Sequence, residues 1–268
     1  MKIITVNIGK GGTGKSTVSF NLAKWLSDQK KKKTLLIDGD YSCNLSYSLQ
    51  TEKESSSIID IFLDQSFNPE TISSNLDFLK GSENLKDKFL DLQSKHNNCL
   101  IFFMWLMDHV SVMEEYEYII IDTHNNKDLV TLNFLAVADI ILGVSDPSRN
   151  GLRAWLELED TVEELKNDLV EARTRESYVN AEAYLIANRV DHIGNSSKVF
   201  LETAKIQPNY LGMIQKKEIL AKSLMEDISV FEYYDKMNAS EQQKQKAFIK
   251  SLNDLFEKII NLGGTNHE

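Results

Sequence analysis

The chain has 268 residues, of which 42% are hydrophobic and 26% charged, so it is long enough and apolar enough to bury a sizeable core. Its 30 Lys and Arg against 40 Asp and Glu give a formal net charge of -10 at pH 7. Contact with nucleic acid or an anionic membrane would therefore require a local basic patch, because the field of the whole chain repels both. The two cysteines, Cys43 and Cys99, match neither a zinc spacing nor a CxxC redox pair, which favours a reduced, intracellular protein.

Targeting and membrane-spanning segments are not expected. Lys2 is followed by a short apolar stretch that runs directly into a glycine-rich loop, unlike a signal peptide. The longest apolar run, residues 100–107, is too short to cross a bilayer and predicts a buried helix. We therefore expect a soluble, cytoplasmic protein.

The chain reads as a single domain. Three prolines, no low-complexity tract and no internal repeat argue against linkers. We expect one domain over residues 1–262, followed by a disordered tail at 263–268.

Short apolar runs alternate with longer helical patterns along the chain. The expected strands are Lys2–Ile8, Thr34–Asp38, Tyr118–Asp122, Asp139–Ser145, Ala183–Asn188 and, more weakly, Asn209–Ile214. The expected helices include Thr17–Ser27, Gly151–Arg175 with a stripe of Leu152, Leu156, Leu158, Val162 and Leu165, and Ala247–Leu262. This alternation predicts an α/β fold with a doubly wound, mainly parallel sheet and helices on both faces. Ligands bind such sheets at the carboxyl ends of the strands.

The first loop satisfies the phosphate-binding pattern G-x-x-x-x-G-K-[ST] with Gly9, Gly14, Lys15 and Ser16. It follows a strand and opens a helix, so its backbone N–H groups can surround phosphate oxygens at a helix N-terminus. Lys15 is expected to reach the β- and γ-phosphates and Ser16 to ligate Mg²⁺. The expected nucleotide contacts in this loop are Lys10, Gly11, Gly12, Thr13, Gly14, Lys15, Ser16 and Thr17.

Lys10 is a second lysine that the general pattern does not require. The stretch KGGTGKS resembles the deviant Walker A motif of the ParA/MinD ATPases, which include plasmid and chromosome partition ATPases. This resemblance implies that Lys10 reaches across an ATP-dependent homodimer to the phosphates bound by the partner subunit. There it would act like an arginine finger, by placing positive charge where phosphoryl transfer develops negative charge.

Three aspartates extend the resemblance. Asp38 and Asp40 end the second strand in LLIDGD, and Asp40, Asn44, Leu45 and Ser46 match or nearly match the family's D-P-Q-G-N-L-T segment, whereas Tyr41, Ser42 and Cys43 do not. The resemblance implies that Asp40 orients the attacking water and that Asp38 lies in the Mg²⁺ shell. Asp122, after the apolar strand YEYIII, resembles the Walker B aspartate that holds Mg²⁺.

Two later segments carry the resemblance further. Relatives continue the Walker B strand as D-T-P-P or D-T-P-G, whereas this chain has Asp122-Thr123-His124-Asn125-Asn126. His124 could touch the γ-phosphate region, although a polar loop residue is the simpler interpretation. Asn188-Arg189 resembles the family's N-R pair, which implies that the Asn188 amide reads the adenine edge.

The first hypothesis for function is an ATP-dependent DNA partition ATPase. The family implies a Mg-ATP sandwich dimer that binds nonspecific DNA, slow hydrolysis stimulated by a centromere-binding, ParB-like partner, and association with the nucleoid if DNA is bound. Residues 196–268 hold ten lysines and ten acidic residues, and some of those lysines could form a DNA-binding stripe or be ordinary solvated lysines. The candidates are Lys198, Lys205, Lys216, Lys217, Lys222, Lys244, Lys246 and Lys250. The run Lys30–Lys33 is expected to be a solvated turn.

Two alternatives stay open. A MinD-like positioning ATPase would use the helix at 247–262 on a membrane, but its polar face mixes Lys250 and Lys258 with Asp254 and Glu257, which favours a helix docked on the sheet over membrane contact. A nucleotide switch with little turnover is suggested by the altered 123–126 segment.

Overall fold

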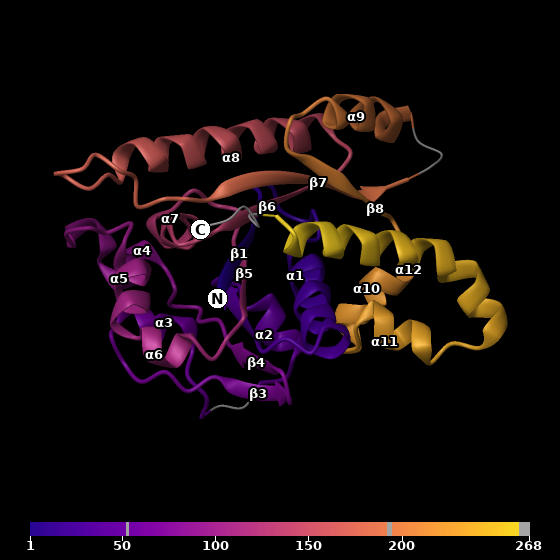
Figure 1. Cartoon of the computed structure of the whole chain (residues 1–268), viewed down its shortest axis with the longest axis horizontal. Helices are drawn as coiled ribbons and strands as arrows, with labels where there is room; N and C mark the ends of the chain where they lie inside the picture. Colours follow the sequence, from indigo (N-terminus) through magenta and orange to yellow (C-terminus); the bar gives the residue numbers. More distant parts are fainter. Residues whose placement is uncertain (52–53, 192–194, 263–268) are drawn as a thin grey trace.

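A computed structural model describes residues 1–51, 54–191 and 195–262, and the tail expected at 263–268 lies outside these ranges. Within them, eight strands form one sheet in the order β3-β4-β2-β5-β1-β6-β7-β8 (Figure 1). The strands are β1 (Lys2–Asn7), β2 (Thr34–Gly39), β3 (Glu70–Ser73), β4 (Leu76–Leu79), β5 (Tyr118–Thr123), β6 (Ile140–Ser145), β7 (Glu182–Val190) and β8 (Tyr210–Gln215). Neighbouring strands are parallel except β3, which runs antiparallel to β4. The predicted doubly wound α/β fold is confirmed.

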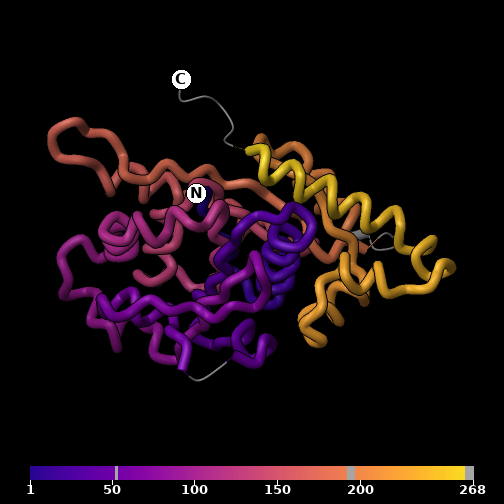
Figure 2. The backbone as a smooth tube through the Cα atoms, turned by 60° about the horizontal axis from the view of Figure 1, so that its bottom comes forward, coloured from indigo at the N-terminus to yellow at the C-terminus, as the bar shows by residue number. Residues whose placement is uncertain are grey.

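Helices cover both faces of the sheet. One face carries α1 (Lys15–Lys24), the π-helical η1 (Trp25–Gln29), α10 (Glu218–Met225), α11 (Val230–Asp235) and α12 (Ala239–Ile260). The other carries α3 (Ile58–Phe62), α5 (Ile101–Asp108), α7 (Leu129–Ala136), α8 (Arg149–Asp168) and α9 (Asn195–Lys205). The remaining short helices are α2 (Asn44–Ser48), α4 (Asp87–Leu90), η2 (Leu92–Ser94) and α6 (Val110–Met113). Figure 2 shows the C-terminal helices grouped at one end of the molecule.

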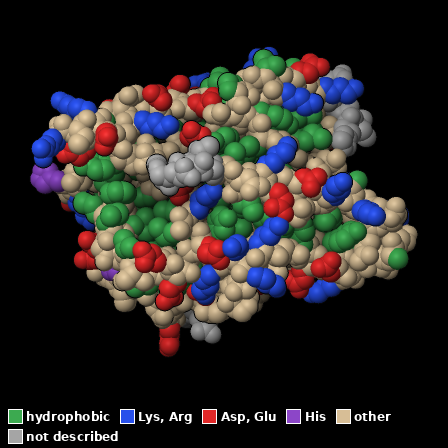
Figure 3. Space-filling model, in the orientation of Figure 1, with side chains coloured by type: hydrophobic (Ala, Val, Ile, Leu, Met, Phe, Trp, Pro, Cys, Tyr) green, Lys and Arg blue, Asp and Glu red, His purple; other side chains and the backbone are tan. Residues whose placement is uncertain are grey.

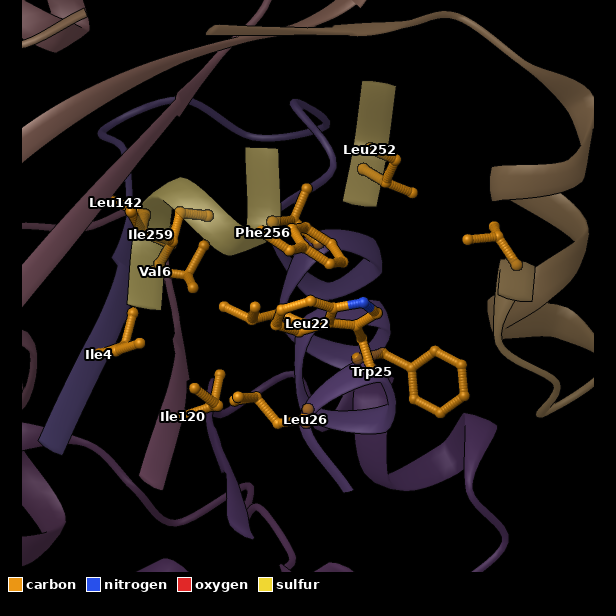
Figure 4. Close-up of a cluster of buried hydrophobic side chains, with 14 of the residues drawn as sticks. Ile4, Val6, Leu22, Trp25, Leu26, Ile120, Leu142, Leu252, Phe256 and Ile259 are labelled. Carbon is orange, nitrogen blue, oxygen red and sulfur yellow. The ribbon is translucent and has the colours of Figure 1, made fainter. Parts of the chain in front are cut away.

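The central strands alternate their side chains between two cores. Ile4 and Val6 of β1 point into the cluster on the α1 and α12 face, whereas Ile3 packs into the cluster on the other face. Figure 4 shows Trp25 and Phe256 in the first of these cores, and their rings meet edge to face with centroids 5.6 Å apart. Helices cover both faces of the sheet at β1, β5 and β6. This explains why the sequences of these strands are continuously apolar and do not alternate with polar residues.

The C-terminal helix α12 is longer than the predicted 247–262 segment. It begins at Ala239, where Asn238 and Glu241 form a capping box. Phe248, Leu252, Leu255, Phe256 and Ile259 are all buried against the sheet and neighbouring helices. The apolar stripe is therefore covered by the protein's own core. Among the described residues, no helix is long and apolar enough to cross a membrane.

Several expectations were wrong in detail. Leu158, Val162 and Leu165 of the predicted stripe are buried, but Leu156 is 47% exposed, because the buried face of α8 runs through Ala154 and Trp155 at that point. α8 ends at Asp168, short of the predicted Arg175, and β3 and β4 were missed because they are short and include polar residues. In α5, Phe102, Trp105 and Leu106 are buried, whereas Met104 and Met107 are exposed.

The turn at Lys30–Lys33 is paired rather than simply solvated. Lys30 contacts Glu257 of α12, Lys32 lies 2.6 Å from Glu117, and Lys33 contacts the buried Asp77. The turn lies at the amino end of β2, so it is remote from the loops at the carboxyl ends of the strands.

Candidate nucleotide-binding site

The candidate site lies at the carboxyl ends of β1, β2 and β5. A pocket of about 580 Å³ opens there between the first loop, the segment after β2 and the segment after β5. Most of the predicted phosphate-loop residues line it, together with residues from two other loops. The lining residues include Gly11, Gly12, Thr13, Gly14, Lys15, Ser16, Thr17, Asp40, His124 and Arg189.

The first loop has the backbone conformation that a phosphate cradle needs. Gly12 and Gly14 have φ values of 74° and 96°, in the left-handed region that favours glycine. A Cβ at Gly14 would also lie 2.5 Å from the Asn188 side chain. α1 then begins at Lys15 without a side-chain cap, so its first N–H groups face the pocket end of the helix and can receive an anion.

Lys15 is buried beside the pocket, with only 8% of its surface exposed. Burial lowers the pKa of its ammonium, and the carboxylates of Asp122 and Asp40 partly offset this effect. Phosphate oxygens would favour the charged ammonium further.

Asp38 and Asp122 are paired across β2 and β5 and are both buried. Burial, together with the charge of Asp38, raises the pKa of Asp122 to about 7, while Ser16, Lys15 and Ser19 act in the opposite direction. Burial likewise raises the pKa of Asp38 to about 6, against hydrogen bonds from Ser46 and Asp40. Two adjacent buried carboxylates with one nearby ammonium leave an excess of negative charge when both are ionised. A divalent cation would neutralise it.

The two carboxylates differ in the oxygen atoms they can offer. Ser46 donates to Asp38 Oδ2 from its backbone N–H (2.9 Å) and its hydroxyl (2.7 Å), and the Asp40 N–H donates to Oδ1 (3.2 Å). Ser19 Oγ donates to Asp122 Oδ1 (2.9 Å), whereas Oδ2 of Asp122 is buried and accepts no hydrogen bond from the described residues. Asp122 and the adjacent Ser16 therefore fit a Mg²⁺ ion more directly than Asp38 does.

Asp40 organises the loop after β2. Its Oδ1 accepts hydrogen bonds from the backbone N–H (2.8 Å) and hydroxyl (2.6 Å) of Ser42. Cys43, which stands where the family pattern has glycine, has a φ of 53°. The left-handed backbone explains why glycine suits this position.

The Lys10 side chain is paired within its own chain and does not line the phosphate pocket. Its Nζ lies 2.6 Å from both carboxylate oxygens of Asp146 and 2.8 Å from Ser148 Oγ. Ser148 also caps α8, because its Oγ accepts from the Gly151 N–H at 2.9 Å. The sequence analysis did not connect Lys10 with Asp146, because the two residues are 136 positions apart in the chain.

Asn188 and Arg189 come from the end of β7 and contact the phosphate loop. Asn188 Nδ2 donates to Thr13 O at 2.7 Å, and the Arg189 guanidinium donates to Gly12 O. Both residues line a second cavity of about 630 Å³, which also includes Gly14, Thr17 and Gln215. This cavity adjoins the phosphate loop.

His124 lies at the phosphate pocket, and its ring packs on that of Tyr41. The two ring centroids are 4.2 Å apart with a 30° tilt, and His124 Nε2 lies 4.0 Å from Asp40 Oδ1. The histidine is therefore more than a polar loop residue, and sequence reasoning missed its contact with Tyr41.

Comparisons with known proteins identify the family and the fold. A protein-family model described as an AAA domain matches residues 1–173. An uncharacterized protein of Methanocaldococcus jannaschii is 28% identical over 247 residues, which cover 87% of this chain and 92% of that protein. The chromosome partitioning protein ParA of Myxococcus xanthus is 29% identical over 175 residues, 63% of this chain and 60% of that protein.

Among solved structures, a candidate plasmid partition protein of Borrelia burgdorferi B31 bound to AMPPNP superposes with a TM-score of 0.75. It is 21% identical, and the match covers 97% of this chain and 98% of that one. This likeness concerns the fold. The chain therefore belongs to the AAA-domain family of P-loop ATPases, and its fold is that of the ParA/MinD-type enzymes.

Proposed function

We propose that the protein is a Mg²⁺-dependent ATPase that acts in DNA partition. The observation that carries the ATPase part is the buried pair of carboxylates Asp38 and Asp122 next to the phosphate loop, with the Lys15 ammonium close to Asp122, because such a charge arrangement suits a Mg²⁺-nucleotide. The partition part rests on the similarity to the Myxococcus ParA protein and the Borrelia protein.

The residues at and beside the pocket divide the work of nucleotide binding and hydrolysis in this proposal. The N–H groups of residues 11–17 and Lys15 hold the phosphates, and Asn188 with Arg189 orients the base. Ser16 and Asp122 would hold Mg²⁺ together with Asp38, and Asp40 would orient the attacking water. Mg²⁺, when bound, would neutralise the charge that develops on the phosphate oxygens.

Lys10 completes the site in a homodimer. In the single subunit its ammonium is paired with Asp146 and Ser148. In the sandwich dimer it exchanges this contact for the phosphates bound by the partner subunit, where positive charge favours phosphoryl transfer. Assembly would then depend on the nucleotide, since only a triphosphate provides the replacement anion.

Lys10→Ala tests this role. We expect ADP affinity to change little, while ATP-dependent dimerisation and phosphate release fall by at least tenfold, in line with the effect of a lost charge contact in phosphoryl transfer. The measurements are light scattering with a non-hydrolysable ATP analogue and steady-state phosphate release. Lys31→Ala, in the turn at the amino end of β2, is the matched control. A Lys10→Ala protein that dimerises and hydrolyses ATP like the unchanged protein would refute the proposal.

The surface lysines near β8 are the candidate contacts for DNA. Lys198 and Lys205 lie on α9, whereas Lys244, Lys246 and Lys250 lie on α12, and these two helices pack on opposite faces of the sheet at the end that carries β8 (Figure 1). On the face seen in Figure 3, basic side chains are interspersed with acidic ones. We propose that the β8 edge, doubled in a dimer, contacts DNA phosphates.

The proposed DNA contact is tested by measuring how much of the protein is retained on DNA with ATP, with ADP and without nucleotide. We expect retention with ATP alone and a steep loss with rising salt, because phosphate contacts release counterions. A Lys244→Gln, Lys246→Gln, Lys250→Gln variant should lose retention without losing hydrolysis. Equal retention in all three nucleotide states would eliminate DNA binding as an ATP-controlled step. Stimulation by a centromere-binding partner is tested by adding that protein to the same hydrolysis assay.

A further inference from the structure

Two departures from the family pattern, Tyr41 and His124, lie in contact. Tyr41 and His124 both stand where the pattern has proline, and their rings stack with centroids 4.2 Å apart. We propose that the Tyr41–His124 stack is a positioning device that joins the loop after β2 to the loop after β5 and thereby sets Asp40 for hydrolysis. This inference rests on the proposed ATPase function.

The replaced prolines explain why such a contact is needed. Proline fixes φ and so stiffens a loop through its own backbone. Tyr41 and His124 leave φ free, so the stiffness of both loops has to come from side-chain contacts. A ring stack supplies this, because aromatic pairs are stabilised by more than the burial of their surface.

Tyr41 is fixed within the turn that Asp40 builds. Asp40 accepts two hydrogen bonds from Ser42, and the Cys43 N–H donates to Asp40 O at 2.9 Å. Lys86 lies 5.0 Å above the Tyr41 ring, and Asn126 Nδ2 donates to the Tyr41 hydroxyl at 3.4 Å. Because Tyr41 is part of this turn, holding its ring also holds the Asp40 carboxylate.

His124 is anchored on the other side to the central strand. Asn7 Nδ2 at the end of β1 donates to His124 O (3.2 Å) and to Thr123 Oγ1 (2.7 Å), and Thr123 Oγ1 donates to Val6 O (2.8 Å). The imidazole is 16% exposed, and its Nε2 is 4.0 Å from Asp40 Oδ1. A continuous set of contacts therefore runs from β1 through His124 and Tyr41 to Asp40.

A double-mutant cycle measures the coupling. Tyr41→Ala and His124→Ala should each lower kcat roughly three- to tenfold, the factor that corresponds to the strength of one aromatic pair. The double variant should be no slower than either single variant, since all three lack the same contact. KM for ATP should stay within about twofold of the unchanged protein, because the stack lies at the hydrolytic side of the pocket and the base cavity is elsewhere.

The controls separate positioning from a general structural effect. Tyr41→Phe keeps the ring and should retain kcat, whereas Tyr41→Leu keeps an apolar side chain without the ring and should not. His109→Ala removes the other histidine stack, on Trp105 of α5 (centroids 4.2 Å apart), and should leave kcat unchanged. Should the alanine variants fail to fold, the Phe and Leu pair carries the test.

The outcomes distinguish this inference from the proposed function. The positioning role would be overturned if the decreases in kcat of the two single variants multiplied in the double variant, or if the Tyr41→Phe protein were as slow as Tyr41→Ala. Either result would leave the ATPase proposal intact. No Mg²⁺-dependent hydrolysis by the unchanged protein would refute the ATPase proposal and the positioning role together.

Discussion

At the residue scale, Asp122 is a side chain that costs free energy to keep ionised without a bound cation. It is buried beside a second carboxylate, and its pKa is raised to about 7. In the absence of Mg²⁺ and nucleotide, its folded-state pKa lies above its ordinary value of 3.8. Between these two values the native state binds more protons than the unfolded state, so Asp122 lowers the free energy of unfolding as the pH rises from about 4 to about 7.

Asp122→Asn should therefore stabilise the ligand-free protein at pH 8 while reducing Mg²⁺-dependent ATP hydrolysis. We expect a gain of at least about 1 kcal/mol, since one pKa unit corresponds to about 1.4 kcal/mol. The gain should shrink as the pH falls toward 4. Urea unfolding at a series of pH values measures it, and Asp235→Asn on the exposed surface of α11 is the control. A variant that is less stable than the unchanged protein at pH 8 would contradict this account of the site.

At the element scale, the start of α8 links the core to Lys10. Gly143 of β6 packs directly under Trp155 of α8, and Ser148 at the start of the same helix caps it and contacts Lys10. Gly151 has no space for a side chain, because a Cβ would lie 2.4 Å from Asp146 O. The position of the helix therefore determines the position of the groups that hold Lys10.

Gly143→Ala should push α8 away from the sheet. The new Cβ would lie 2.5 Å from Trp155 Cε3, and such overpacking costs about 1–3 kcal/mol. Gly212→Ala in β8 is the matched control, since its Cβ would meet only the end of the flexible Leu255 side chain, at 3.1 Å. Chemical denaturation of both variants measures the difference. Equal stabilities would show that the Gly143–Trp155 contact adapts without cost.

At the scale of the whole molecule, the Lys10–Asp146 pair opposes dimerisation in our proposal. Breaking it in each subunit costs free energy before any contact with the partner's nucleotide forms. A hydrogen-bonded charge pair contributes about 1.5–3 kcal/mol, so this cost is large enough to control assembly.

Asp146→Ala should therefore lower the dimer dissociation constant with a non-hydrolysable ATP analogue by roughly tenfold or more. Asp160→Ala, an exposed acidic residue on α8, is the control that changes the net charge equally. Sedimentation over a range of protein concentrations measures the effect. If Asp146→Ala dimerises no more tightly than Asp160→Ala, the pair does not restrain assembly.

The sequence by itself determined the sheet, the phosphate loop and the strand ends that carry Asp38, Asp122 and Asn188. These features are local, because apolar runs, glycine positions and a lysine at a fixed spacing are set by neighbours in the chain. The parallel direction of most strands follows from the α/β alternation, whereas the order of the strands in the sheet was decided only by the tertiary structure. The prediction failed for β3, β4 and Leu156, where short or mixed patterns leave the element and its buried face undetermined.

Only the tertiary structure decided which distant side chains meet. Asp146 and Ser148 hold Lys10, Tyr41 stacks on His124, and Asn188 contacts Thr13, across separations of 83 to 175 positions (124 minus 41 for the stack). No local pattern encodes these contacts, because they depend on how the loops converge at one edge of the sheet. The same convergence brings together positions 41 and 124, where the chain lacks the prolines of the family pattern, so that Tyr41 and His124 form one contact.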